Sequence, residues 1–282
     1  MRYLVGFIIV IAIIVLVPVV AGALPSSFSQ IYSRAAREGL SRPTEDVLLT
    51  EADLAHLPAP VQRYVRYSGA VGKPRVRDFH ATMGGAMCRE QGGAWTPITA
   101  EQYNFYDEPT RLFLMKSSLS GIPFDGLHVY RNGSATMRVR VANVAQVVDA
   151  KGPKMNLGET VTMFNDMCVF APATLVDSSI KWEPIDDLHA KAEFTNAGNT
   201  VGAVLTFNAA GELIDFYSDD RLMSSDGKTY LSYRWSTPLS DYRDFGGRKI
   251  ATKGVAIWHT PKGEYPYIRF DITDVAYNVV AQ

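Results

Sequence analysis

Histidines and neighbouring carboxylates are the residues of this sequence that could do acid–base or hydrolytic chemistry. Two acidic pairs occur, Asp186–Asp187 and Asp219–Asp220. Because adjacent residues on a strand point to opposite faces, neither pair makes a shared carboxylate site, and turn or surface positions are expected. The histidines stand at intervals that suit neither a metal site nor a catalytic motif: His56, His80, His128, His189 and His259.

A hydrolase-like pair is the catalytic arrangement that these residues would allow. It would join His128 or His80 to a carboxylate such as Asp125 or Asp187, within hydrogen-bond reach at a cleft. The sequence has no nucleophile elbow, glycine-rich phosphate or dinucleotide loop, zinc-protease motif or EF-hand loop. We therefore expect no catalytic residue, no cofactor and no metal site, with the hydrolase as an alternative.

Cys88 and Cys168 are the only cysteines. Their even number is compatible with one disulfide in an oxidising compartment, and two separate buried thiols are the favoured alternative. Neither cysteine belongs to a C-x-x-C pair, so redox catalysis and zinc binding have little support.

Large apolar side chains are the candidates for binding a ligand. Each one alone is more often part of a core, but together they would suit the lining of a cavity for an acyl chain. The candidates are Trp95, Phe113, Met115, Tyr130, Met137, Trp182, Phe207, Trp235 and Trp258.

The charge balance limits the partners of the chain. Its 282 residues include 28 Lys and Arg against 29 Asp and Glu, for a net charge of −1. There is no basic excess to neutralise phosphates, so nucleic-acid binding has no electrostatic support. The expected ligand is uncharged or apolar.

Residues 1–24 are predicted to be a targeting or anchoring segment. No charged side chain occurs from Tyr3 to Leu24, a stretch long enough to cross a bilayer core of about 30 Å as a helix. Pro18 followed by Ala21-Gly22-Ala23 also resembles the end of a cleaved signal sequence. A retained transmembrane helix is favoured, and either reading places the rest of the chain outside the cytoplasm, on the periplasmic or cell-surface side.

A few helices are expected among many strands. Residues 25–49 are predicted to be a stalk or linker with a short helix over 26–40, and helices are predicted near Thr50 and Pro60. Val161, Phe164, Met167 and Cys168 recur at helical spacing and predict a helix over 158–170.

The rest of the chain alternates with period two between turns that contain Gly, Asn, Asp or Pro. Residues 200–207 and 212–218 predict a hairpin, with a turn at 208–211. Further strands are predicted over 128–130, 135–148, 189–195, 229–235, 249–258 and 265–279. About ten antiparallel strands cannot stay flat. We expect a mainly β (α+β) fold, a curled half-barrel over residues 50–282 with a few packing helices.

Several short motifs resemble an uncharacterised bacterial family over roughly residues 50–280. The most specific is Leu-Pro-Ala-Pro-Val-Gln-Arg-Tyr at 57–64, and Phe170–Ala171 departs from an aromatic pair containing Trp. The weaker motifs are Trp95 with Glu101–Gln102, Pro172–Leu175, Trp182–Asp187, Tyr265–Tyr267 and Tyr277–Asn278. The strand order with an internal helix is also similar in architecture to the LolA and LolB lipoprotein carriers, which implies an apolar cavity. The family supplies no catalytic residues.

These observations favour a membrane-anchored, extracytoplasmic protein that binds a lipid or another hydrophobic ligand without catalysis. The alternatives are a structural or interaction module of the cell envelope and the hydrolase described above. An apolar cavity of several hundred cubic ångströms would favour ligand binding, whereas a solid core would favour the module.

Overall fold

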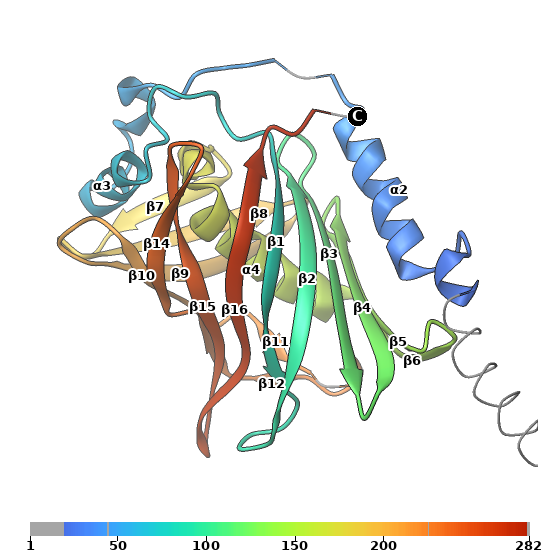
Figure 1. Cartoon of the computed structure of the whole chain (residues 1–282). Helices are drawn as coiled ribbons and strands as arrows, with labels where there is room; N and C mark the ends of the chain where they lie inside the picture. Colours follow the sequence, from blue (N-terminus) through green and yellow to red (C-terminus); the bar gives the residue numbers. More distant parts are fainter. Residues whose placement is uncertain (1–19, 44, 225, 281–282) are drawn as a thin grey trace, which may run out of the picture.

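In the computed structural model, which describes residues 20–43, 45–224 and 226–280, a sheet of fourteen antiparallel strands curls around one helix, α4 (Pro153–Phe170) (Figure 1). Helix α4 contacts strands from both halves of the sheet, which shows the curl. The first half of the sheet consists of β1 (Asp78–Cys88), β2 (Trp95–Phe105), β3 (Thr110–Leu119), β4 (Ile122–Arg131), β5 (Ser134–Val141) and β6 (Ala145–Lys151). The predicted curled antiparallel sheet is confirmed.

The second half follows α4 in the chain. It consists of β7 (Ile180–Pro184), β8 (His189–Asn196), β9 (Asn199–Phe207), β10 (Leu213–Ser218), β13 (Arg234–Ser236), β14 (Leu239–Phe245), β15 (Arg248–Thr260) and β16 (Gly263–Tyr277). The spatial order is β6-β5-β4-β3-β2-β1-β16-β15-β13-β10-β9-β8-β7, with β14 paired to β15. The last strand therefore pairs with the first and joins the two halves.

Local sequence explains most hairpins. On β9, Val201, Ala203, Leu205 and Phe207 are buried while the residues between them are not, as alternation predicts. The predicted hairpin of β9 and β10 is confirmed, with antiparallel pairing of the two strands. At the β4–β5 turn, Asn132 and Gly133 both have positive φ, 51° and 73°, the backbone that two-residue hairpin turns require.

Two predicted strands are wrong. The stretch 135–148 is divided between β5 and β6, because Ala142 and Asn143 take positive φ and reverse the chain. The stretch 229–235 contains pieces of two sheets: β12 (Leu231–Ser232), which pairs with β11 (Leu222–Met223), and β13 in the main sheet. The residues of this stretch therefore pair with strands of two different sheets, β11 and β10.

The two ends of the sheet approach each other at one side of the half-barrel. Asn196 Nδ2, on the β8–β9 hairpin, donates to Tyr130 Oη at 2.7 Å, and Asn199 Nδ2 donates to the carbonyl oxygen of Gly133 at 3.0 Å. These bonds connect the two hairpins β4–β5 and β8–β9, which lie far apart in the order of strands. They hold the two ends of the curled sheet together on that side.

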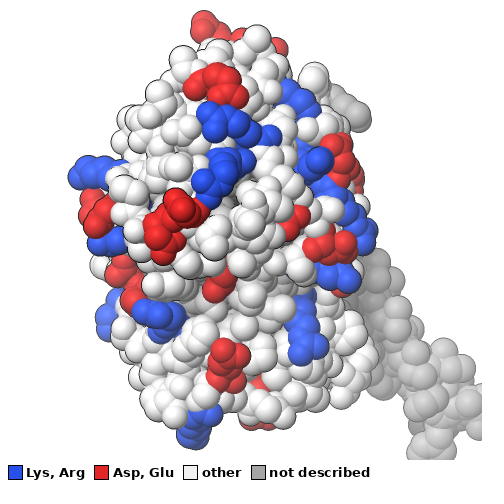
Figure 2. All heavy atoms as spheres, turned by 90° about the vertical axis from the view of Figure 1, so that its left-hand side faces the viewer, with Lys and Arg blue, Asp and Glu red and all other residues white. Residues whose placement is uncertain are grey.

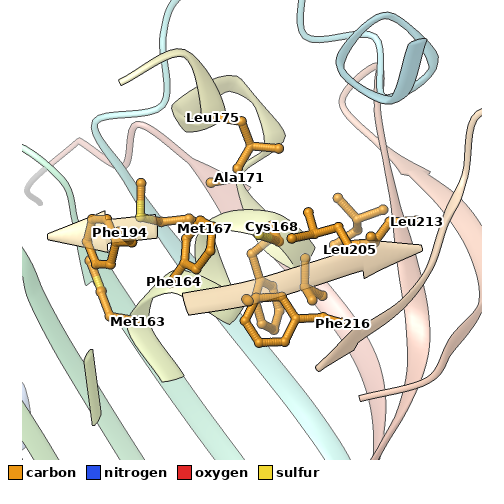
Figure 3. Close-up of a cluster of buried hydrophobic side chains, with 14 of the residues drawn as sticks. Met163, Phe164, Met167, Cys168, Ala171, Leu175, Phe194, Leu205, Leu213 and Phe216 are labelled. Atoms are coloured by element: carbon orange, nitrogen blue, oxygen red, sulfur yellow. The ribbon is translucent and has the colours of Figure 1, made fainter. Parts of the chain in front are cut away.

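One face of α4 makes the main core with the second half of the sheet (Figure 3). The Phe164 ring stacks on Phe194, with centroids 5.3 Å apart, and meets Phe216 edge-on at 5.6 Å. Met167 and Cys168 lie in the same cluster. Helix α3 (Ala59–Tyr67) adds Tyr64, whose hydroxyl donates to the carbonyl oxygen of Cys168 at 2.7 Å.

Other short helices lie outside the curl. The helix expected near Thr50 is a 3-10 turn, Glu51–Leu54, and a second such turn, Pro172–Val176, follows α4. Helix α2 (Phe28–Leu40) packs over β3 and β4, where Phe28 and Tyr32 form a second core with Phe105 (Figure 1). Its Gly39 lies so close to the Phe105 ring that an added Cβ would be 2.4 Å from it.

The chain before α2 lies against the β5–β6 hairpin. Gly22 lies near Asn143, where an added Cβ would be 3.2 Å from the side-chain nitrogen, and Arg140 donates to the carbonyl oxygen of Ser26 at 2.6 Å. Most of the predicted anchor, residues 1–19, lies outside the part of the chain that the structure describes. Within that part, no helix has the length and apolar character to cross a bilayer.

The outer surface carries charges of both signs. Figure 2 shows Lys and Arg side chains interspersed with Asp and Glu over one side of the molecule. This mixture agrees with the near-neutral net charge of the chain.

Candidate ligand-binding cavity

A cavity of about 810 Å³ lies between α4 and the concave face of the sheet. Its size is within the range of small-molecule sites, roughly 300–1,000 Å³. Apolar side chains from both halves of the sheet make the sheet wall, including Met83, Met115, Phe124, Val139, Ala256 and Ile272. Helix α4 contacts both halves of the sheet, and the cavity is the part of the concave side that the helix does not fill.

The cavity reaches solvent at the β3–β4 turn and along β6. Three apolar side chains that line it are exposed there: Leu119 at 42%, Ile122 at 54% and Val147 at 60%. Along β3, the lining residues Arg111, Phe113, Met115 and Leu119 alternate with outward-facing ones. The strand therefore leads from a buried charge to an apolar rim.

The helix wall of the cavity is polar. Glu159, Thr162 and Asp166 lie on one face of α4, because positions three, four and seven apart share a side of a helix. All three side chains are buried. The face opposite the Phe164 core is thus turned to the cavity and carries two carboxylates.

Arg111 joins these two carboxylates. Its Nε lies 2.7 Å from Asp166 Oδ2 and its NH1 lies 3.2 Å from Glu159 Oε2. Asp166 also accepts from Gln102 Nε2 at 2.7 Å and from Asn104 Nδ2 at 3.0 Å. Buried charges are tolerated only when paired and hydrogen-bonded in this way.

The pKa values of the two carboxylates shift in opposite directions. Burial raises the pKa of Glu159, but His128, Arg111 and Arg221 lower it more, and the net pKa is about 2. Burial dominates at Asp166, and its pKa is raised despite Arg111 beside it. Glu159 is therefore the carboxylate held firmly in its charged form, with His128 Nδ1 at 3.3 Å from its Oε1.

Arg221 lies on the cavity side of Thr162. Its Nε donates to Thr162 Oγ1 at 3.2 Å and its NH1 donates to Tyr267 Oη at 3.2 Å. The guanidinium carbon lies 4.6 Å from the ring centroid of Trp235 and 5.2 Å from that of Trp258. Stacking on aromatic rings holds an arginine while leaving the edges of its plane available.

Five of the nine side chains proposed from the sequence line the cavity, namely Phe113, Met115, Met137, Trp235 and Trp258. Trp235 and Trp258 are paired across β13 and β15, which explains why both reach the same wall. Ligand binding by these side chains stays a prediction.

The other four do not line the cavity, and that expectation is corrected. The guanidinium carbon of Arg269 lies 4.0 Å from the ring centroid of Trp95. The Tyr130 hydroxyl accepts from Asn196, where the hairpins β4–β5 and β8–β9 meet. Trp182 and Phe207 pack on the Phe164 and Tyr64 rings of the core, with centroids 6.4 and 5.6 Å apart. Helices α4 and α3 fill the concave side of the second half of the sheet, and they leave no free space beside Trp182 and Phe207.

The predicted histidine–aspartate pairs do not form. His80, Asp125 and Asp187 line no part of the cavity, and the His80 ring stacks on Tyr103 with centroids 4.4 Å apart. The acid beside His128 is Glu159. In the described ranges, no serine, threonine or cysteine is hydrogen-bonded to His128.

Other groups considered for chemistry have structural partners. Asp186 accepts from the backbone of Leu188 and His189 in the β7–β8 turn. Cys88 and Cys168 are free and buried, and burial raises the pKa of Cys168 well above its usual value. Residues 20–43, 45–224 and 226–280 contain no group of three or more His, Cys, Asp or Glu that could hold a metal ion.

Sequence analysis missed the polar wall. Its signal was the placement of Glu159 and Asp166 seven residues apart in the predicted helix, which puts two carboxylates on one face. Arg111, which pairs with both carboxylates, and Arg221, which donates to Thr162, lie about fifty residues away on either side, so no local pattern joins them to the helix.

Comparisons with known proteins give a family and distant structural similarities. The profile of DUF6544, described as a family of unknown function, matches residues 47–270, and the predicted resemblance to an uncharacterised family is confirmed. A comparison with curated protein sequences finds no match.

Two solved structures are similar over most of their length. A DUF1329-family protein from Desulfovibrio piger is 13% identical with a TM-score of 0.44, and the match covers 80% of this chain and 95% of that one. A LolA-superfamily protein from Nitrosomonas europaea is 10% identical with a TM-score of 0.41, over 78% of this chain and 94% of that one.

Proposed function

The chain belongs to the DUF6544 family of unknown function, and we propose that it binds the acyl chain of a lipid, or another hydrophobic ligand, in the cavity beside α4. The binding is non-covalent and involves no catalysis. The protein works outside the cytoplasm, tethered to a membrane by its N-terminal segment, residues 1–24.

The cavity is the observation that carries this proposal. A volume of about 810 Å³ and a sheet wall of methionine, valine and aromatic side chains suit an apolar ligand. An envelope module that only needs a stable fold would have no use for such a space, because unfilled apolar volume costs stability. The cavity therefore favours ligand binding over the interaction module.

The exposed apolar rim supports a ligand of some length. Leu119, Ile122 and Val147 continue the cavity lining out to solvent. Such a rim would let an acyl chain enter end-on without crossing polar surface. The uncharged sequence from Tyr3 to Leu24 supports the proposal that the acyl chain enters the cavity from a membrane.

Native mass spectrometry of the full chain, released from a non-ionic detergent, tests the proposal. We expect the wild type to carry lipid or fatty-acid adducts. Gly126 lines the cavity, and an added Cβ would be 3.4 Å from Cε of Met115. A Gly126→Leu variant therefore fills the cavity and should lose most of the adduct.

The matched control is Gly84→Leu. Gly84 does not line the cavity, and an added Cβ there meets no atom within 4 Å. This variant makes the same chemical change on β1 and should keep the adduct of the wild type. Ligand binding in this cavity is contradicted by a wild type without adducts, or by equal adducts in both variants.

A further inference from the structure

The charges that line the cavity do not match the near-neutral chain. Five basic side chains line it within the described part of the chain, against two carboxylates, Glu159 and Asp166. The whole chain has 28 basic and 29 acidic side chains, so the excess is local. The basic side chains are Arg89, Arg111, Lys154, Arg221 and Lys253.

Arg111 already satisfies both carboxylates, since it forms an ion pair with each. Arg221 forms no ion pair with any carboxylate of the described residues, and its charge reaches Glu159 only at longer range. The guanidinium has five N–H donors, and its bonds to Thr162 and Tyr267 use two of them. The remaining donors have no acceptor in this part of the structure.

Tyr267 adds a second donor at the same place. Its hydroxyl oxygen accepts from Arg221 and, at 3.1 Å, from Trp235 Nε1. A tyrosine hydroxyl that accepts twice still has its own proton to donate, and no acceptor for it is found in the described residues. Arg221 and Tyr267 therefore present donors, and a positive charge, to a cavity with apolar walls.

We propose that the ligand is an amphiphile with one anionic oxygen head group, a carboxylate or a phosphate monoester, which Arg221 and Tyr267 bind. This inference rests on the proposed function and names the class of ligand for the same cavity. A planar guanidinium edge matches two oxygens of either head group, and such charge-assisted bonds are stronger than neutral ones.

The sheet wall of the cavity suits the alkyl chain of such a ligand. Ile268, the neighbour of Tyr267, pairs with Met87, which pairs with Thr96, so Tyr267 lies toward the end of the sheet where β3 reaches Leu119. An amphiphile with its head group at Arg221 and Tyr267 would have its alkyl chain along the apolar sheet wall. A ligand without an anionic head group would leave the remaining donors of Arg221 and Tyr267 without an acceptor, at a cost in affinity.

Photo-cross-linking in a membrane tests this inference on the full chain. We would insert the chain in phosphatidylcholine nanodiscs and expose it to three probes with the same diazirine-labelled alkyl chain. Their head groups are a carboxylate, a phosphate monoester and a primary alcohol. Peptide mapping of the cross-links reports whether the strands of the cavity are labelled.

We expect the carboxylate or the phosphate probe to label the cavity about tenfold more efficiently than the alcohol. Arg221→Gln should remove this preference and leave labelling by the alcohol unchanged. Tyr267→Phe, which keeps the ring, should reduce the preference in the same direction. Which of the two anionic probes labels best identifies the head group.

Arg89→Gln is the matched control, because it removes one positive charge from an exposed position at the same cavity. It should leave the preference intact. The inference is overturned if the alcohol labels the wild type as well as the anions do, or if Arg89→Gln acts like Arg221→Gln. If none of the probes labels the cavity strands, the proposed function itself fails.

Discussion

At the scale of residues, the cavity joins an apolar wall to a group of buried charges. Ions removed from water cost several kcal/mol each unless partners replace the lost solvation. Asp166 has Arg111, Gln102 and Asn104 as partners, and Glu159 has Arg111 and His128. These bonds hold the polar face of α4 in one arrangement, against which a head group can bind without further rearrangement.

The pKa of Glu159 predicts how stability depends on pH. Its folded value, about 2, is below the ordinary 4.5, so ionised Glu159 contributes stability that is fully present above about pH 4.5 and is lost as the pH falls toward 2. Asp166, with a raised pKa, has the opposite sign. The Glu159→Gln variant lacks the pH-dependent contribution of Glu159 to the free energy of unfolding, whereas the contribution of Asp166 remains.

We therefore expect the melting temperature of the wild type to fall more steeply between about pH 5 and pH 2 than that of Glu159→Gln. Thermal melts followed by circular dichroism at a series of pH values measure this. The control is Glu183→Gln, an exposed glutamate paired with Lys191, which should follow the wild-type curve. Parallel curves for the wild type and Glu159→Gln would contradict the prediction.

At the scale of elements, close approach of a helix to the sheet depends on a single missing side chain. Gly39 in α2 lies over the Phe105 ring, and a Cβ at this position would be 2.4 Å from it. Alanine favours a helix more than glycine does, so intrinsic propensity alone would make Gly39→Ala stabilising. Overpacking costs about 1–3 kcal/mol and should outweigh that gain.

Gly39→Ala should therefore weaken the docking of α2 on β3 and β4. Hydrogen exchange followed by mass spectrometry should show faster exchange in residues 28–40, while α4 keeps its protection. Ser33→Ala, at an exposed position of α2, raises helix propensity without the contact and should exchange as slowly as the wild type. Unchanged exchange in Gly39→Ala would show that the ring moves aside without cost.

The elements differ in how far the sequence determines them. The β9–β10 hairpin was predictable because the alternation of apolar residues and a turn that contains Asn208 and Gly211 are local signals. The stretch 229–235 was not, because its apolar residues alternate as in one strand while they serve two sheets. Trp182 and Phe207 have the side chains of a cavity wall, and only the position of α4 and α3 decides that they belong to the core.

At the scale of the whole molecule, composition predicts a different ligand from the one we propose. A net charge of −1 indicated an uncharged or apolar one, but averaging over the chain conceals the basic excess of the cavity. The curl of the sheet brings Arg111, Arg221 and Lys253 to one space from distant parts of the sequence. The distribution of charge in three dimensions, which no sum over the sequence reports, decides the chemistry of the site.

A ligand that binds only the folded chain should stabilise it as a whole. At a concentration of about one hundred times its Kd, the expected gain is about 2.7 kcal/mol. The melting temperature of the full chain in nanodiscs should thus rise with the concentration of the preferred amphiphile. Gly126→Leu should show no such rise, and an equal rise in this variant would mean that binding occurs elsewhere.

The contact of Gly22 with the β5–β6 hairpin has a consequence for loading of the proposed cavity. Gly22 lies beside Asn143 on the β5–β6 hairpin, and Val147 of the same hairpin belongs to the apolar rim of the cavity. In the proposed tethered protein, the membrane attachment and the rim are therefore on the same side. Such an attachment would hold the opening within a short reach of the bilayer, where the effective concentration of lipid is far above that of any dissolved amphiphile. Capture then becomes a two-dimensional search along the membrane plane, and modest intrinsic affinity suffices to keep the cavity filled.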